Sequence, residues 1–383
     1  MSDFDLARVT DGFLDVKRTR GDPEADVLIE RLAEREGPER ARALFDRLIR
    51  EIELDVAALP EELRRFVEGI GLPEWADPTL IARSEAVFRE HGPRYLLLLY
   101  FKSLPTLYAC AKGATVLTST GRLAHDGADM RIFARRIAET GQFLVHVMEP
   151  GGLERGAGRA TALKIRFIHA SIRAFVRARG WDEPVLGAPI NQEDLAITLQ
   201  TFSSTILRGL AQTGIELGAD ERRAVMHHWC VVGHLLGIDG DLLPEEFEEG
   251  VALEDRILRR QAAASEEGRL LTGALVGFAR ERLPRRFRNA PQLLVAYLVD
   301  ERVERAVGIE DRLPWYVRLL PRFLTRLFRI ASRLTDYHPT VDRTVDTLAS
   351  LLTLAMVNYF NNYKEAPFYV PQALKRAWIG DPE

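Results

Sequence analysis

Hydrophobic residues recur every three to four positions along most of the chain, which is the spacing of amphipathic helices, and few stretches alternate in the way of strands. Residues 94–117 form a buried apolar segment that is interrupted at Pro105. The pattern therefore predicts an all-α fold. Further predicted helices run over about residues 129–148, through residues 164–177 to a stop at Gly180, and over about residues 220–236 to a stop at Gly237.

The first ninety residues are charged and helix-prone, with a break at Gly37-Pro38, and we expect residues 1–90 to form an N-terminal helical cap. No repeat, low-complexity tract or clear linker divides residues 91–383, so the simplest arrangement is a single large helical domain. Within this domain one helix is predicted to begin at Asn191, an N-cap residue, with Asp194 as the carboxylate of its capping box.

Composition narrows the classes of function. The 52 Lys and Arg residues are outnumbered by 56 Asp and Glu residues, so nucleic acid is not expected as a partner. The two cysteines, Cys110 and Cys230, form no CxxC motif and fit a reducing compartment. The N-terminus lacks the features of a secretory signal, and the longest apolar stretch, residues 95–101, is too short to cross a bilayer. We therefore expect a soluble cytoplasmic protein, of an oligomeric state that the sequence does not indicate.

His169 lies in the middle of a predicted helix, on its apolar side. Ala162, Ile165, Ile172 and Val176 fall within about 60° of it on a helical projection, so the imidazole is expected to point toward the core. Arg166 and Arg173 lie one turn before and after the histidine, on one flank of this stripe, and could bind the propionates of a haem whose iron the imidazole ligates. The alternative is a core histidine that is hydrogen-bonded to a backbone carbonyl beside two solvated arginines.

A second helix, over residues 130–148, turns a cation and a hydroxyl toward the core. Arg136 and Thr140 share a face with large apolar residues, and Glu139 lies toward its edge. A buried guanidinium needs a carboxylate, a propionate or carbonyl groups as partners. Either Arg136 and Glu139 form an ion pair within the helix, or this face forms a polar pocket against a cofactor.

His227, Cys230 and His234 lie along one line of a helix, but the two histidines are ~10.5 Å apart in rise and cannot share one ion. We therefore favour a packing role for this segment, with Gly233 allowing close helix contact, over a metal site. The chain has no GxSxG, GxGxxG or GxxxxGK[ST] motif, so nothing supports a serine nucleophile, a dinucleotide site or a P-loop.

Residues 315–334 form a basic amphipathic pattern, with Pro321 as an early break. Such a helix can lie on an anionic membrane or guide an apolar substrate inward, although it is more often a solvated face over a core. The arginines of this face are Arg318, Arg322, Arg326, Arg329 and Arg333.

Several segments taken together resemble the latex-clearing proteins, which are haem-dependent rubber oxygenases, and the related endoplasmic-reticulum-bound oxygenase of mycophenolic acid biosynthesis. The resemblance covers about residues 95–310, and it is specific because the motifs occur together and in the same order. The matching segments are SLPTLYACAKGATVLTSTGRL, the helix with Arg136, Glu139 and Thr140, KIRFIHASIR, GAPINQEDLAITLQTFS, HHWCVVGHLLGI followed by LPEEF, and APQLLVAYLVDERVERAVGI.

The resemblance implies a haem b, with its iron, in a globin-like helical core flanked by additional N- and C-terminal helices. His169 matches the proximal ligand, and Arg136 and Thr140 match residues of the distal or supporting side. Arg166 and Arg173 become candidate cofactor-binding residues by position. Latex-clearing proteins carry a lysine between the distal arginine and threonine, where this chain has Glu139, so a lysine-capped iron is not expected here.

The sequence thus predicts a haem b-dependent oxygenase that uses O2 on a C=C bond of an apolar substrate. Because latex-clearing proteins are secreted and this chain shows no export signal, a smaller isoprenoid or unsaturated lipid is expected rather than rubber. Glu139 would act as acid or base in a partly dry pocket, and Thr140 would donate a hydrogen bond to the bound oxygen. The candidate pocket walls are Phe133, Ile137, Phe143 and Phe202.

Two alternatives remain open at this point. The first is a non-catalytic haem- or lipid-binding protein that keeps the fold without the chemistry. The second is a haem-free helical scaffold that contacts membranes through the basic face of residues 315–334.

Overall fold

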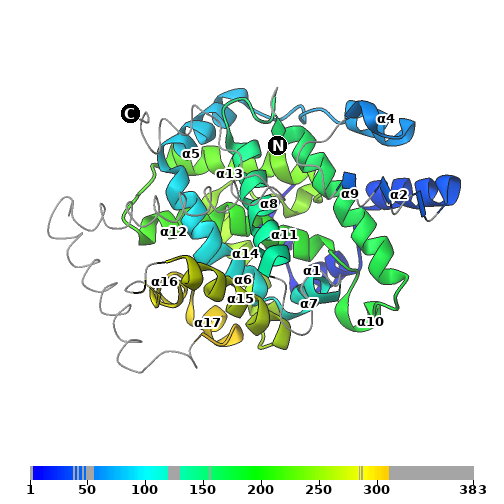
Figure 1. Cartoon of the computed structure of the whole chain (residues 1–383). Coiled ribbons are helices and arrows are strands. Elements are labelled where there is room, and N and C mark those ends of the chain that lie inside the picture. The colour runs from blue at the N-terminus through cyan, green and yellow to red at the C-terminus, as the bar shows by residue number, and fades with distance from the viewer. Residues whose placement is uncertain are drawn as a thin grey trace. The chain divides into compact units, whose positions relative to one another are not determined.

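The computed structural model describes residues 3–309, except for positions 38, 41–42, 45–46, 49–55, 120–129, 155–156, 284 and 286–287. In this part of the chain every regular element is a helix (Figure 1). The all-α prediction is therefore confirmed, whereas the globin-like arrangement of the core stays a prediction. The basic face with Arg318, Arg322, Arg326, Arg329 and Arg333 lies outside the described residues.

The chain divides into two compact units that do not follow the order of the sequence. Unit 1 takes Met1–Arg89, Glu139–Gln200 and Ala219–Glu254, and unit 2 takes Glu90–Ala138, Thr201–Gly218 and the described residues from Asp255 onward. The predicted division into a cap of residues 1–90 and a domain of residues 91–383 stays a prediction. Four helices continue from one unit into the other along the chain: α5 (Pro78–Leu98), α8 (Met130–Met148), α11 (Gln192–Phe202) and α14 (Phe247–Gln261).

In unit 1 the N-terminal helices pack on α9 (Ala157–Arg177), the helix that carries His169. Figure 1 shows α2 (Pro23–Glu36) beside α9. Buried apolar residues of α2 and α4 (Glu61–Gly69) form one cluster with Phe167 and Ala170 of α9. The remaining helices of unit 1 are η1 (Leu6–Arg8), α1 (Asp11–Arg18), η2 (Val56–Ala58), α10 (Glu183–Leu186), α13 (Ala219–Leu235) and η4 (Gly240–Leu242).

Local sequence signals set the ends of these helices as expected. The Asn191 side chain accepts a hydrogen bond from the backbone N–H of Asp194 at 3.0 Å and donates one to the Asp194 carboxylate at 2.8 Å, which confirms the predicted capping box at the start of α11. Gly180 and Gly237 follow α9 and α13 with φ of 83° and 78°, a left-handed conformation that glycine adopts readily. The predicted ends of both helices are confirmed.

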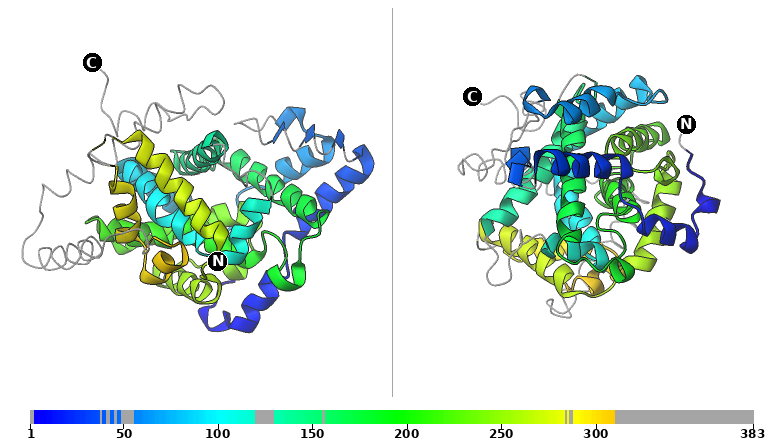
Figure 2. Two further views of the ribbon diagram at one scale, coloured as in Figure 1. Left: turned by 60° about the horizontal axis from the view of Figure 1, so that its bottom comes forward. Right: turned by 90° about the vertical axis from the view of Figure 1, so that its right-hand side faces the viewer.

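In unit 2 the apolar segment of residues 94–117 is buried and broken, as predicted. The end of α5 passes into a π-helix, η3 (Leu99–Ser103), and then into α6 (Leu104–Tyr108), which has Pro105 in its first turn. Proline fits there because the first N–H groups of a helix have no partner within it. The other helices of unit 2 are α7 (Ala111–Ser119), α12 (Ser204–Gln212), α15 (Glu266–Arg282), α16 (Ala290–Leu298) and α17 (Glu301–Ala306), which the views of Figure 2 show from two further sides.

No helix within the described ranges combines the length and the apolar character that crossing a bilayer requires. The helix α9, with 21 residues, is long enough, but arginines such as Arg166 and Arg173 interrupt its apolar positions.

His228 of α13 ties this helix to the end of α8 within unit 1. The side chain is fully buried, and its Nε2 donates a hydrogen bond to the carbonyl oxygen of Val147 at 2.8 Å. Carbonyl groups in the last turn of a helix have no partner within it, so this bond satisfies one of them. Burial lowers the pKa of His228 to about 4.

We expect acid to destabilise the protein through His228. Because its pKa is lower in the folded chain than the ordinary value of 6.5, the neutral ring stabilises the fold above about pH 6.5, and this contribution, about 3 kcal/mol, is lost as the pH falls toward 4. A His228→Gln variant keeps a donor amide but cannot titrate, so its free energy of unfolding should depend less on pH in this window. Urea unfolding between pH 7 and pH 4 measures the difference.

Met226→Leu, at another buried position of α13, removes no titratable group, so it serves as the control and should retain the pH dependence of the wild type. An unchanged pH dependence in His228→Gln would contradict the assignment.

Candidate functional site

His169 lies near the middle of α9 and is half-buried, not fully buried as its apolar stripe suggests. Its Nδ1 atom is shielded from solvent, so the accessible part of the ring lies away from Nδ1. On the same stripe Ile165 and Ile172 are also half-buried, whereas Ala162 and Val176 at its ends are fully buried. The histidine therefore sits in a short apolar surface that the protein covers only in part.

The three predicted residues of α8 differ in exposure. Arg136 and Thr140 are half-buried, and Glu139 is exposed. This exposure does not support a dry pocket around Glu139, and its role as acid or base stays a prediction. Thr140 and Glu139 belong to unit 1, while Arg136 belongs to unit 2.

In unit 2 the charge of Arg136 acts on a buried phenol. Burial raises the pKa of Tyr108 to about 12, and the nearby Arg136 guanidinium opposes this shift. A positive charge beside a buried hydroxyl favours hydrogen-bond donation by that hydroxyl. Tyr108 thus belongs to the surroundings of Arg136, although the sequence did not single it out.

The four predicted wall residues are all buried, with exposed fractions of 2% for Phe133, 4% for Ile137, 5% for Phe143 and 7% for Phe202. Phe133 packs against Phe278 of unit 2 with ring centroids 6.1 Å apart, and Phe143 packs against Trp229 of unit 1 at the same distance. Their contact with a substrate stays a prediction.

The connection between α8 and α9 brings the two candidate helices together within unit 1. His146 of α8 and Thr161 of α9 form a buried hydrogen bond of 2.9 Å between Nδ1 and Oγ1. Near the start of α9, Gly158 lies so close to α8 that a Cβ atom there would come within 2.5 Å of the His146 carbonyl oxygen. Thr140 and His169 each lie about two turns away from this junction on their own helices.

Arg166 and Arg173, the predicted propionate partners, are buried by other parts of unit 1. Their exposed fractions are 6% and 1%, so the alternative of two solvated arginines is wrong. Arg166 donates from Nε and Nη2 to both oxygens of Asp22, at 2.5 and 2.9 Å, and from Nη2 to Glu24 at 2.9 Å. Arg173 donates from Nε to Asp26 at 2.6 Å. Contact of either arginine with a propionate stays a prediction.

The two ion pairs differ in electrostatics. Burial disfavours the charge of Arg166, but the hydrogen bonds and charge of Asp22 outweigh this effect and raise the pKa of Arg166. Burial lowers the pKa of Arg173 and raises the pKa of Asp26, and each partner offsets the shift of the other only in part. The pair of Arg173 and Asp26 therefore lies in an environment where neither charge would persist alone.

The residues His227, Cys230 and His234 of α13 make structural contacts. The Nε2 atom of His227 accepts a hydrogen bond from the backbone N–H of Asp77 at 2.9 Å, at the start of α5. The Cys230 thiol donates to the Pro244 carbonyl at 3.1 Å, and the Trp75 ring lies edge-on to both histidines. In the part of the chain that the structure describes, no group of three or more His, Cys, Asp or Glu residues is arranged to hold a metal ion.

Sequence reasoning did not find the carboxylates that hold α9. Asp22 carries a local signal, since Asp-Pro before an amphipathic run marks an N-cap, and its side chain does accept a hydrogen bond from the Ala25 N–H at 3.3 Å. Nothing local, however, relates Asp22 to Arg166, which lies 144 positions away along the chain. Glu24, Asp26 and Gln192 were missed for the same reason.

Comparisons with known proteins agree on one family. Residues 96–333 match the family described as "ER-bound oxygenase mpaB/B'/Rubber oxygenase, catalytic domain". A rubber oxygenase of Streptomyces sp. (strain K30) is 26% identical over 270 residues, which are 68% of this chain and 63% of that protein. The chain therefore spans less than two thirds of the length of this relative.

Among solved structures, a latex clearing protein in the closed state resembles this chain with a TM-score of 0.68. The match covers 89% of this chain and 91% of that chain, at 24% sequence identity. At this level of identity the likeness establishes a shared helical fold.

The close approach of α8 and α9 gives a test of the junction. Gly158→Ala should destabilise the protein by about 1–3 kcal/mol, because the new methyl group would meet the backbone of His146 and Val147, which cannot move aside cheaply. Thermal or urea unfolding measures the loss.

Gly277→Ala, inside α15, is the matched control, since nothing lies within 4 Å of a Cβ atom there. It should stabilise the protein by up to about 1 kcal/mol through helix propensity. Equal effects of the two substitutions would show that the junction is not tightly packed.

Proposed function

Because the chain belongs to the family of endoplasmic-reticulum-bound and rubber oxygenases, we propose that it is a haem b-dependent oxygenase acting on a C=C bond of an apolar substrate. The single observation that carries the haem assignment is the surface around His169. A histidine with a shielded Nδ1 atom lies between two half-covered isoleucines on a helix that also contributes Phe167 and Ala170 to a buried cluster.

The residues around His169 fit a haem in two respects. A neutral imidazole can ligate iron through one ring nitrogen while the other is held inside the protein. The half-covered side chains of Ile165 and Ile172 offer the apolar contact that a flat macrocycle requires. One histidine is enough for this purpose, so the lack of a larger metal-binding cluster among the described residues has no bearing on a haem.

A bound haem would supply the binding and activation of O2, which no amino-acid side chain provides. His169 would hold the iron. Thr140 is half-buried on α8 and would donate a hydrogen bond at the oxygen-binding side. Glu139 is exposed, so it would exchange protons with water at the rim of the site instead of acting in a dry pocket. The positive charge of Arg136 would stabilise negative charge that develops near it during the reaction.

The relatives support the class of substrate. One is named a rubber oxygenase, and rubber is an apolar polymer of isoprene units that contain C=C bonds. We propose a smaller isoprenoid or unsaturated lipid for this chain, and we propose Phe143, which lies in the same unit as His169, as an apolar side chain that excludes water. O2 would be the second substrate, and cytoplasmic localisation belongs to the same proposal.

A second candidate is a haem- or lipid-binding protein without catalysis. The observation that favours it is Glu139, an exposed carboxylate at the position where the resemblance places a lysine. This candidate predicts the same absorbance of bound haem but no consumption of O2.

The first test measures the absorbance of bound haem. Purified protein loaded with haem should show a Soret band, and His169→Ala should lose most of that band because no other ligand replaces the imidazole. His91→Ala should bind haem as the wild type does. A wild-type protein without a Soret band after loading would overturn the haem assignment.

Oxygen consumption separates the two candidates. With a short isoprenoid alkene, the haem-loaded wild type should consume O2 and yield oxygenated products, detected by an oxygen electrode and mass spectrometry. A normal Soret band without O2 uptake on any of a panel of isoprenoid and unsaturated lipid substrates would favour the non-catalytic candidate.

A further inference from the structure

The helix α9 has two sides with different environments. Phe167 and Ala170 are fully buried in the cluster that α9 shares with α2 and α4. His169 lies about 100–160° around the helix from these residues, on the half-covered side. Arg166 and Arg173 lie between the two sides, about 40–60° from His169. The arginines thus mark the border between the packed side of α9 and the side of the candidate ligand.

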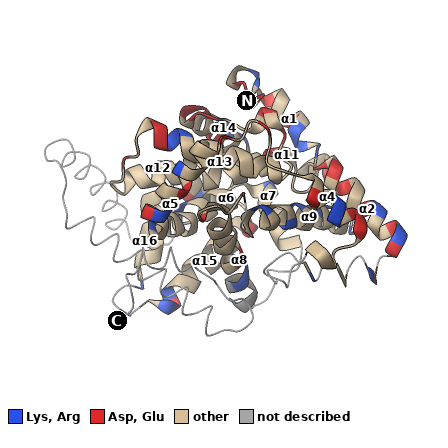
Figure 3. Ribbon diagram, turned by 90° about the horizontal axis from the view of Figure 1, so that it is seen from above, with Lys and Arg blue, Asp and Glu red and all other residues tan. Residues whose placement is uncertain are grey.

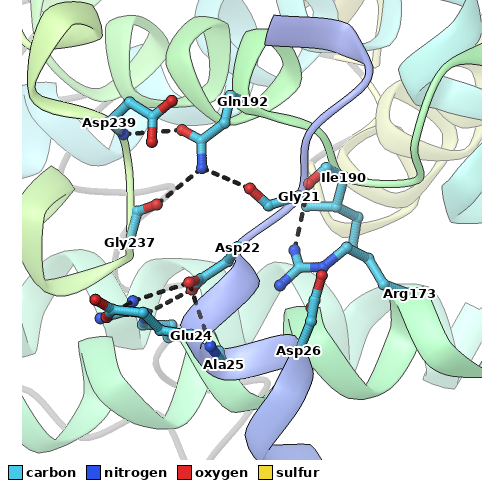
Figure 4. A network of polar contacts seen from close by, with 11 residues as sticks. Gly21, Asp22, Glu24, Ala25, Asp26, Arg173, Ile190, Gln192, Gly237 and Asp239 are labelled. Atoms are coloured by element: carbon cyan, nitrogen blue, oxygen red, sulfur yellow. Dashed lines mark hydrogen bonds and ion pairs between the residues drawn. The ribbon is translucent and has the colours of Figure 1, made fainter. Parts of the chain in front are cut away.

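Two carboxylates of the α2 segment hold these arginines (Figure 4). Asp22 precedes α2 and binds Arg166 with both oxygens, and Asp26, one turn later, binds Arg173. The arginines are three residues before and four residues after His169, so the two ion pairs lie on either side of it along the helix axis. Figure 3 shows acidic and basic positions side by side where α2 runs along α9.

Two ion pairs restrict the position of α9 more than one ion pair could. A single ion pair restrains α9 at one point, whereas two pairs separated by about two turns add a second restraint along the helix to the apolar packing of Phe167 and Ala170. We call the four residues Asp22, Asp26, Arg166 and Arg173 the α2–α9 clamp.

A glycine makes room for each ion pair. A Cβ atom at Gly21 would come within 2.7 Å of Arg173 Cδ and within 2.9 Å of the Asp26 carboxylate. A Cβ atom at Gly237 would collide with Asp22 Oδ2 and lie 2.6 Å from Arg166 Nε. Both pairs are therefore enclosed by backbone that tolerates no larger side chain without movement.

One buried amide holds both glycines. Gln192 donates from Nε2 to the carbonyl oxygens of Gly21 and Gly237, at 2.8 and 2.9 Å, and accepts from the N–H of Asp239 at 2.9 Å. Figure 4 shows this side chain between the backbone segments of Gly21 and Gly237. The enclosure of the clamp is itself fixed by hydrogen bonds.

The loop before α11 contributes to the same arrangement. Ile190 has φ of 50°, a left-handed conformation that is unfavourable for a β-branched residue. Its carbonyl oxygen accepts a hydrogen bond from Arg173 Nη1 at 3.3 Å. Strain of this kind persists only where the surrounding structure over-determines the backbone, and here the clamp supplies one of the contacts.

We propose that the α2–α9 clamp consists of positioning residues that present His169 to the haem. The inference rests on the proposed function, and it gives the N-terminal helices a part in the site. Buried ion pairs contribute little net stability compared with apolar residues of similar volume, so we assign the clamp a geometric role. Groups that hydrogen-bond to a metal-ligating histidine commonly affect metal affinity by about 10- to 100-fold, and we expect the clamp, which acts through the backbone of α9, to act within this range.

The decisive variant replaces one ion pair by apolar residues. In the full-length chain, the double variant Asp26→Leu with Arg173→Met should unfold at a urea concentration similar to that of the wild type, because apolar packing substitutes for the pair. Its Kd for haem, titrated by Soret absorbance, should rise by about 10- to 100-fold, with a shifted ferric spectrum. In the haem-free protein, amide hydrogens of α9 around His169 should exchange faster than in the wild type.

Two further variants separate positioning from stability. Arg35→Met removes another ion pair of α2, with Glu62 of α4, that includes no residue of α9 or of the clamp, and it should leave the Kd and the spectrum unchanged. Gly21→Ala keeps every charge of the clamp but displaces Arg173, and it should weaken haem binding in the same direction as the double variant. Arg173→Lys should bind haem more tightly than Arg173→Met, since it restores a charge for Asp26.

The outcomes distinguish the two proposals. If the wild type shows a Soret band that depends on His169, and the double variant and Gly21→Ala share its Kd, spectrum and hydrogen exchange, the clamp is structural only and this inference is overturned. If the wild type shows no such band, the proposed function fails, and the role of the clamp toward haem fails with it. If the double variant does not fold, the haem Kd and spectra of Gly21→Ala and Arg173→Lys decide whether the clamp positions His169 or is structural only.

Discussion

A buried guanidinium group needs an anion or carbonyl oxygens within hydrogen-bond reach, and carboxylates that meet this need join the N-terminal helices to the helix of the candidate ligand. Arg166 and Arg173 are almost wholly excluded from solvent, and Asp22 and Asp26 meet them from the start of α2. Asp22 caps α2 and Asp26 lies in its first turn, so the two pairs fix α2 relative to α9 more closely than apolar packing alone would, since apolar contacts tolerate sliding and repacking.

The histidines of unit 1 illustrate two different uses of the same side chain. His228 is fully buried, donates to a backbone carbonyl, and has its pKa lowered by burial to about 4. It is a structural histidine. His169 is half-covered and lies among isoleucines that are half-covered too, on a helix that also contributes Phe167 and Ala170 to a buried cluster. This contrast between two neighbouring environments, together with membership in an oxygenase family, is what directs attention to His169.

The sequence predicted the fold well wherever short-range chemistry decides it. The spacing of apolar residues gave α8, α9 and α13, and Asn191 with Asp194 gave the start of α11. Prediction of the site was less complete. The positions of His169, Arg136 and Thr140 on their helices followed from periodicity, but Glu139 proved exposed and the two arginines proved buried. Helical periodicity tells which residues share a face, whereas it does not tell what covers that face.

By itself the sequence determined the helices, their caps and their ends, because these depend on residues within one or two turns of each other. It also determined which residues lie beside His169 on α9. Only the tertiary structure decided the partners of Arg166 and Arg173, since the carboxylates that bind them lie 144 and 147 positions away. An ion pair requires two charges within a few ångströms, and no local pattern records which distant segment the fold will bring to that distance.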